Sequence, residues 1–182
     1  MARVPYLDRK DVKPEHQDLL ARGINLYRAL VHSPDGLRSF SALGHFIRHT
    51  SRLDPRLREM AILQVGYSAK SPYEYSHHIK IGREFGVTDD DVHAIEAETQ
   101  GKATDLPPLT RAILRAAREL TAQPELSDAT FAELRAGLDN ERIVDLILTI
   151  SIYAGVVRLL AALQIDVEPD YQQYLQEFPL PG

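Results

Sequence analysis

Two glutamates and a histidine between residues 59 and 85 have the types and spacing needed for acid–base chemistry. Glu59 is followed by ten residues without a charge, and His78 follows Glu74 by four residues, one helical turn. A carboxylate on an apolar helix face loses solvation, which raises its pKa unless a donor compensates. An imidazole beside a carboxylate can donate or accept a proton near neutral pH. We therefore select Glu59, Glu74 and His78 as candidate catalytic residues.

Both carboxylates also have structural explanations, which the sequence leaves open. Glu59 could instead be a surface charge that pairs with Arg56 or Arg58. Ser71 and Glu74 have the spacing of a capping box, in which a hydroxyl and a carboxylate satisfy free N–H groups of the first helical turn, worth on the order of 1 kcal/mol. Glu74 can be a cap and a site residue at once, so spacing alone does not decide between the two roles.

The histidines allow a structural role or a metal site as alternatives. His78 could be a core histidine bonded to a carboxylate, whereas His77 points about 100° away on the same helix and is expected to be peripheral. Glu74 and His77 have the Glu-x-x-His form of di-iron bundles, but the second copy that such sites need is missing. His45 and His49 lie one turn apart without an evident third zinc ligand. We predict neither a metal nor a cofactor.

The spacing of the polar residues resembles a known motif. The positions of the Glu-x11-Cys-x2-Cys-x3-His motif of alkylhydroperoxidase D-like proteins are occupied here by Glu59, Ser71, Glu74 and His78. Residues 73–78 also resemble the Tyr-Glu-Trp-x-x-His signature of the cysteine-free branch of the carboxymuconolactone decarboxylase family, with tyrosine where tryptophan is usual. The resemblance runs from about residue 25 to residue 163. It implies an all-helical alkylhydroperoxidase D-like bundle, assembled into trimers or hexamers, with the motif lining a pocket at a subunit boundary.

The chain has no cysteine, which limits what the resemblance implies. In the peroxidase branch, the positions of Ser71 and Glu74 hold a redox-active cysteine pair. A serine hydroxyl has no accessible thiolate-like state and cannot pass through sulfenic acid to a disulfide. Peroxidase activity by that mechanism is therefore excluded. The place of Ser71 at a helix start also favours hydrogen bonding to the backbone over a role as nucleophile.

The decarboxylase branch implies a carboxy-lyase that acts on a small carboxylic acid or lactone. Loss of CO₂ leaves negative charge that must be delocalised and then protonated at carbon, a task for a positioned histidine and hydrogen-bond donors. We assign His78 as the proton donor and Glu59 or Glu74 as the group that orients it. The residues expected to contact the substrate are Tyr67, Ser71, Tyr73 and Tyr75.

The motif itself contains no cation that would bind a carboxylate substrate. Arg52, Arg83 or a residue of another subunit would have to supply one. The alternative from another class is a non-catalytic helical oligomer that binds a small ligand, in which the glutamates and His78 are structural. The sequence neither identifies the substrate nor chooses between a trimer and a hexamer.

The elements that must position these residues are all predicted to be helices. Apolar residues recur at helical spacing, Ser-Pro and Asp-Pro pairs mark helix starts, and no segment alternates with the period of a strand. Seven to eight helices are expected, at residues 15–30, 33–50, 54–67, 71–85, 88–101, 109–120, 127–138 and 139–163. They form one all-α domain over residues 1–182, with an N-terminal arm at 1–14 and a C-terminal tail at 169–182.

The composition is that of a soluble globular protein: of 182 residues, 44% are apolar and 26% are charged. A net charge of −5 with dispersed basic residues argues against nucleic acid as a partner. The longest uncharged span near the C-terminus is twelve residues, from Leu146 to Val157, short of the ~20 that cross a bilayer. Charges near the N-terminus do not fit a signal peptide. We expect a cytoplasmic protein whose partners are a small-molecule substrate and further copies of itself.

Overall fold

The computed structural model describes residues 2–181, and within this range the chain forms helices and loops but no strand. The all-α prediction is confirmed. The nine α-helices of this range are α1 (Asn25–Leu30), α2 (Pro34–His45), α3 (Pro55–Ser68), α4 (Pro72–Glu84), α5 (Asp89–Thr99), α6 (Pro108–Ala122), α7 (Asp128–Gly137), α8 (Asn140–Leu163) and α9 (Gln172–Glu177). Their number slightly exceeds the expected seven to eight, because the C-terminal tail contains α9.

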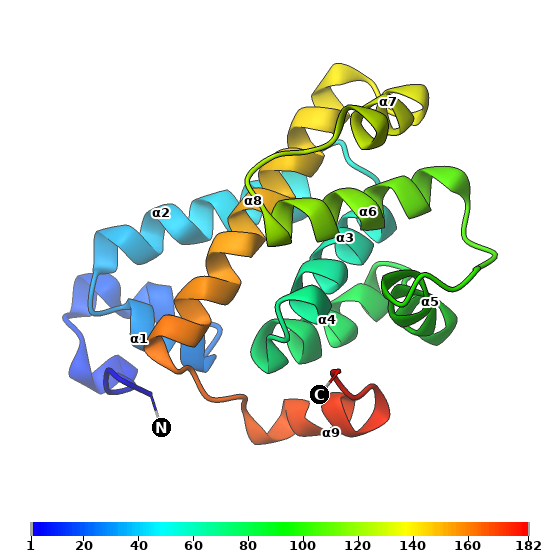
Figure 1. Cartoon of the computed structure of the whole chain (residues 1–182). Helices are drawn as coiled ribbons and strands as arrows, with labels where there is room; N and C mark the ends of the chain where they lie inside the picture. The colour runs from blue at the N-terminus through cyan, green and yellow to red at the C-terminus, as the bar shows by residue number, and fades with distance from the viewer. Residues whose placement is uncertain (1, 182) are drawn as a thin grey trace.

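Helix α3 is the central helix and packs against α4, α5, α6 and α8 (Figure 1). Every residue from Arg58 to Tyr67 is buried, as expected of a helix that is surrounded by others. Asp54 caps its first turn by accepting a hydrogen bond from the Leu57 N–H at 3.0 Å. The uncharged run that follows Glu59 is thus the run that fills the core.

Helix α4 crosses α3 closely at Gly66. A Cβ atom on Gly66 would lie 3.1 Å from the backbone nitrogen of Tyr75, which is tighter than ordinary contact, so glycine permits this approach. In the turn between the two helices, Lys70 has a φ of 48°, and the Ser71 N–H donates to the Gly66 carbonyl at 2.9 Å. The short turn and the close crossing bring the polar residues of α4 against α3.

The two ends of the chain differ from the predicted elements. The helix expected at residues 15–30 is divided, because Gly23 has a φ of +63° and α1 begins only at Asn25. Residues 14–20 form a 3-10 helix instead. In the C-terminal tail, α9 packs against α4, and Phe178 is buried. The tail therefore covers part of the helix that carries the candidate site.

Among residues 2–181, only α8 is long and apolar enough to span a membrane, judged by length and composition alone. Its residues Leu146, Ile150 and Val157 pack in a core cluster that residues of α3 and α6 complete. The buried Asp145 accepts a hydrogen bond from the Ser51 hydroxyl at 2.7 Å and so joins α8 to the loop before α3. These contacts are those of a core helix.

Candidate active site

His78 on α4 lies between two carboxylates. Its Nδ1 atom is 2.6 Å from Oε2 of Glu59 on α3, and its Nε2 atom is 3.0 Å from Oε1 of Glu74, one turn earlier on α4. The exposed fraction is 0% for Glu59 and 4% for both Glu74 and His78. The structure therefore brings together the three residues selected as catalytic candidates, and both ring nitrogens of His78 are engaged.

Arg58, itself buried, holds the other oxygen of Glu59. The Arg58 Nε donates to Glu59 Oε1 at 3.0 Å, and its Nη1 donates to the Arg48 carbonyl at 3.0 Å. Arg56, the other arginine considered as a partner, bonds instead to Asp91 of α5 at 2.9 Å. Glu59 is thus a buried, ion-paired carboxylate and not a surface charge.

These contacts set the charge of each group. Burial opposes a charge on His78, but the carboxylates of Glu59 and Glu74 outweigh burial and raise the pKa of His78 to about 9. Burial also favours the neutral form of Glu59, but His78 and Arg58 outweigh it, so that the pKa of Glu59 is lowered. Basic and acidic side chains alternate along the contacts that join Arg58, Glu59, His78 and Glu74. We call these four residues the acid–base row.

Glu74 and His78 line a pocket of about 400 Å³, a volume typical of small-ligand sites. Much of its wall is apolar, with Leu19, Ile24, Phe40, Ile47, Ile152 and Val156 among the lining residues. Glu59 does not line it. The Glu59 end of the acid–base row is therefore buried away from the pocket, whereas Glu74 lies at the pocket wall.

Tyr153 of α8 also lines this pocket, and its ring meets the His78 ring edge-on at a centroid distance of 5.0 Å. Burial, together with the charges of Glu74 and Glu59, raises the pKa of Tyr153, so its hydroxyl stays protonated and can donate a hydrogen bond. The sequence offered one signal for this residue, because Tyr153 is the only aromatic residue in the uncharged run 146–157.

Arg22 and Arg48 line the pocket too, although both lie outside the motif. Arg48 belongs to a π-helical turn, Phe46–Thr50, that extends α2. This turn places three consecutive residues, Ile47, Arg48 and His49, in the lining of the same pocket. Regular helical spacing separates consecutive residues by about 100°, so no signal in the sequence pointed to Arg48.

The arginines expected to bind a carboxylate, Arg52 and Arg83, lie elsewhere. Arg52 pairs with Glu141 at 3.1 Å, and Arg83 pairs with Asp89 at 2.8 Å. Neither lines the pocket beside His78. The expectation is corrected, because both side chains are held by acidic residues at other surfaces.

Of the four residues expected to contact a substrate, Tyr73 alone lines this pocket. Its hydroxyl donates to Glu168 Oε1 at 3.1 Å. Tyr67 and Tyr75 pack together in the core with ring centroids 5.6 Å apart, and Ser71 is buried at the start of α4. The structure therefore separates Tyr67, Ser71 and Tyr75 from the pocket that Glu74 and His78 line.

In α4, the structure answers the open question of the capping box and contradicts the prediction for His77. Ser71 is the N-cap residue, but its side chain makes no capping hydrogen bond, and Glu74 contacts His78 in place of the first turn. His77 is buried and not peripheral. Its ring stacks on Tyr171 of the C-terminal tail at a centroid distance of 3.6 Å, so the tail covers it.

Among residues 2–181, no three His, Cys, Asp or Glu side chains are arranged to hold a metal ion. His45 and His49 both line the pocket with ring centroids 4.9 Å apart, and within the described chain no third ligand joins them. That the protein uses neither a metal nor a cofactor stays a prediction.

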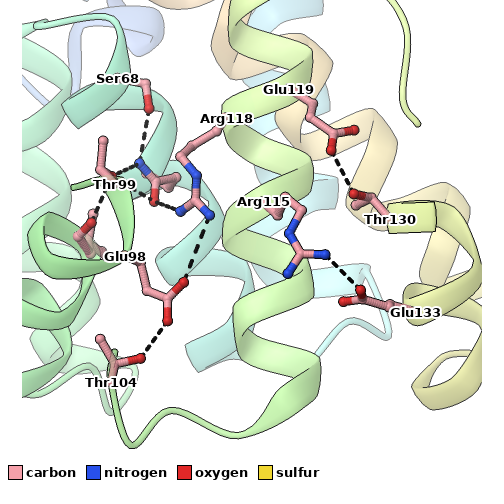
Figure 2. Close-up of polar contacts among 11 residues, drawn as sticks. Ser68, Glu98, Thr99, Thr104, Arg115, Arg118, Glu119, Thr130 and Glu133 are labelled. Atoms are coloured by element: carbon pink, nitrogen blue, oxygen red, sulfur yellow. Dashed lines mark hydrogen bonds and ion pairs between the residues drawn. The ribbon is translucent and has the colours of Figure 1, made fainter. Parts of the chain in front are cut away.

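A second polar network connects α3, α5 and α6 (Figure 2). Gln64 of α3 donates to Ser68 at 3.0 Å and to Thr99 at 2.9 Å, and it accepts from Arg118 at 2.9 Å. Arg118 also lies 3.9 Å from Glu98. We call these five residues the Gln64 network. It contributes no residue to the pocket beside His78.

Comparison with protein families gives one match. Residues 34–119 match the profile of the carboxymuconolactone decarboxylase family. This span runs from α2 into α6 and contains Arg48 and the whole acid–base row. None of the curated protein sequences matches the chain.

Solved structures share the fold over nearly the whole chain. An uncharacterized peroxidase-related protein from Ralstonia eutropha, described as an alkylhydroperoxidase AhpD core, is 21% identical and aligns with a TM-score of 0.79 over 99% of this chain and 98% of that one. A cysteine-to-alanine variant of the debrominase Bmp8, in complex with 2,3,4-tribromopyrrole, is 21% identical, with a TM-score of 0.82 over 98% of each chain. A peroxidase-related protein from Silicibacter sp. is 19% identical, with a TM-score of 0.72 over 94% of this chain and 97% of that one. The chain therefore has the alkylhydroperoxidase D-like fold.

Proposed function

Because residues 34–119 match the profile of the carboxymuconolactone decarboxylase family, we propose that the chain is an acid–base enzyme of this family that decarboxylates a small carboxylic acid or lactone. The observation that carries this proposal is the position of Glu74, which pairs with a protonated His78 and also lines a largely apolar pocket. A carboxylate and an imidazolium that share a proton at the edge of a pocket can deliver that proton to a substrate.

The proposed reaction breaks the bond between a substrate carbon atom and its carboxylate group. The electron pair of that bond passes to the carbon and is delocalised into an adjacent carbonyl, while CO₂ leaves. A proton from the acid–base row then adds to the carbon atom. The Tyr153 hydroxyl, which lines the same pocket, is suited to stabilise the negative charge on the carbonyl oxygen.

The geometry changes the role assigned to His78. Both of its ring nitrogens face carboxylates, so His78 directs no free N–H group into the pocket. In the proposed mechanism His78 passes its proton to the Glu74 carboxylate, and Glu74 delivers that proton to the substrate carbon. His78 is left neutral until a proton from solvent restores its charge. Glu59 and Arg58 keep His78 oriented and protonated. Glu74 is therefore the catalytic residue, and His78 and Glu59 act through it.

The fold relatives support a substrate of modest size. Bmp8, which shares the fold, binds 2,3,4-tribromopyrrole, a small ring compound. A pocket of about 400 Å³ accommodates a single-ring acid or lactone. We also propose that the protein works in the cytoplasm as a trimer or hexamer, which multi-angle light scattering of the purified protein would test.

Turnover assays test the proposed reaction. Purified protein is incubated with 4-carboxymuconolactone and related lactone acids, and release of CO₂ is measured. We expect turnover by the wild type and a loss of roughly 100-fold or more in Glu74→Gln and in His78→Gln. Unchanged turnover in folded Glu74→Gln would overturn the role of that residue.

A second candidate function has an observation in its favour. Because both nitrogens of His78 are already paired, the acid–base row also suits a purely structural role in a non-catalytic helical oligomer that binds a small ligand. This alternative predicts that Glu59→Gln and Glu74→Gln lower the melting temperature or dissociate the oligomer, while no acid is consumed by any form of the protein.

A further inference from the structure

The lining of the pocket beside His78 carries an excess of positive charge. Arg22 and Arg48 each contribute a guanidinium group. Of the two carboxylates in the lining, Glu74 is paired with His78, and Asp18 is paired at 3.1 Å with an arginine that does not line the pocket. An anion that enters the pocket therefore meets a net attraction.

The two arginines differ in how they are occupied. Arg22 lies against Tyr27, with its Nη1 3.5 Å from the Tyr27 hydroxyl and its guanidinium 5.4 Å from the ring centroid. The backbone carbonyl of Arg48 accepts a hydrogen bond from Arg58, but among residues 2–181 no carboxylate pairs with the Arg48 side chain. Arg48 thus keeps its five N–H donors for a ligand.

Other polar groups share the lining of the pocket with Arg48. Tyr153 lines the same pocket, and the charge of Arg48 acts against the rise in the pKa of Tyr153 that burial causes. The Ser41 Oγ lies in the same lining and is buried, without a hydrogen-bond partner among the described residues. Partial desolvation and then the charges of His45 and Arg48 lower the pKa of His49, as expected at an electropositive rim.

We infer that Arg48, assisted by Ser41, forms a subsite that anchors a carboxylate group of the ligand. The inference rests on the proposed function, because it places an acid in the pocket that Glu74 lines. Guanidinium and hydroxyl groups together match the oxygen atoms of a carboxylate, and charge-assisted hydrogen bonds are the stronger kind. The apolar remainder of the wall selects a compact ring as the body of the ligand. The ligand class is thus a small ring compound with a carboxylate at one end.

Benzoate and benzamide are matched probes for this subsite, because they share a ring and differ in charge. Their affinities are measured by NMR titration of the full chain in three forms: wild type, Arg48→Gln and the control Arg52→Gln. We expect the wild type to bind benzoate about tenfold or more tightly than benzamide. Arg48→Gln should lose this preference. Arg52→Gln should keep it, since Arg52 pairs with Glu141 outside the pocket.

Several outcomes would overturn the inference: no binding of benzoate by the wild type, equal affinity for the two probes, or unchanged benzoate binding in Arg48→Gln. Should Arg48→Gln not fold, Ser41→Ala decides, with a severalfold loss of benzoate affinity expected and benzamide unaffected. The proposed function fails separately. If Arg48→Gln loses the benzoate preference but the protein decarboxylates no acid, the subsite is upheld and the proposed reaction fails. If the protein decarboxylates an acid and Arg48→Gln does so with an unchanged KM, only the reaction is upheld.

Discussion

The acid–base row and the Gln64 network each join a buried polar side chain of α3 to neighbouring helices, yet they differ in chemistry. The row consists of four ionisable side chains, and its Glu74 end lines a pocket. The network centres on Gln64, a neutral amide, whose oxygen and nitrogen are both hydrogen-bonded. It supplies no residue to the pocket beside His78.

The difference shows which polar groups are candidates for function. A buried polar side chain needs partners in any protein, and both Glu59 and Gln64 have them, so pairing alone does not distinguish the two regions. The row adds two properties, a histidine with a displaced pKa and access to a cavity. Those two together are typical of active sites. The comparison predicts that changes in the row affect activity and pH response, whereas changes in the network affect stability alone.

The largest expected effect is on turnover. Glu74→Gln should lower kcat on the substrate acid by about 10²- to 10⁴-fold, because the variant can no longer pass a proton. Thr99→Val, a change of similar size in the Gln64 network, should leave kcat within about twofold. Steady-state assays on both variants check this. A comparable loss of kcat in Thr99→Val would remove the distinction between the two regions.

The next effect is on the free energy of unfolding. Arg58→Met removes the buried cation beside Glu59 and should cost about 3–5 kcal/mol, since it leaves a buried carboxylate with one partner fewer. Arg118→Met should cost only about 1–2 kcal/mol, because the Arg118 side chain is partly exposed and lies 3.9 Å from Glu98. Urea unfolding measures both values, and equal losses would contradict the prediction.

The third effect that should distinguish the two regions is the change in the free energy of unfolding with pH. The folded pKa of His78, about 9, lies above the ~6.5 of an unfolded histidine, so protonation of His78 stabilises the fold. This contribution is complete below about pH 6.5 and is lost as the pH rises to about 9, roughly 3 kcal/mol in all. Unfolding free energies at several pH values should show this decline in the wild type and in Thr99→Val. His78→Gln should lack it, and a decline of the same size in His78→Gln would assign the effect to another group.

The smallest effect concerns a single hydrogen bond. Ser68→Ala removes the acceptor that the Gln64 side chain uses at 3.0 Å, and it should cost about 1 kcal/mol. Activity should be unchanged, because Ser68 does not line the pocket. Thermal melting and a turnover assay on the same preparation test both statements, and a loss of activity without a loss of stability would count against them.

Much of the fold and part of the site follow from local patterns. Glu74 and His78 are four residues apart, so any α-helix through them places the two side chains together. The uncharged run after Glu59 similarly marks α3 as a buried helix. Pairing of Glu59 with His78 is not local, and it entered the prediction through the resemblance to a family motif. The break at Gly23 was missed, because a glycine within a helical pattern does not announce a positive φ.

The sequence by itself determined most of the helices, the absence of cysteine chemistry and three members of the acid–base row: Glu59, Glu74 and His78. Tertiary structure decided which residues meet at the pocket: it brought Tyr153 from α8 and Arg48 from a π-helical turn, and it placed Tyr67 and Tyr75 in the core. The physical reason is that helical periodicity reports which side chains share one face of a helix. It does not report which faces of different helices pack together or leave a cavity between them.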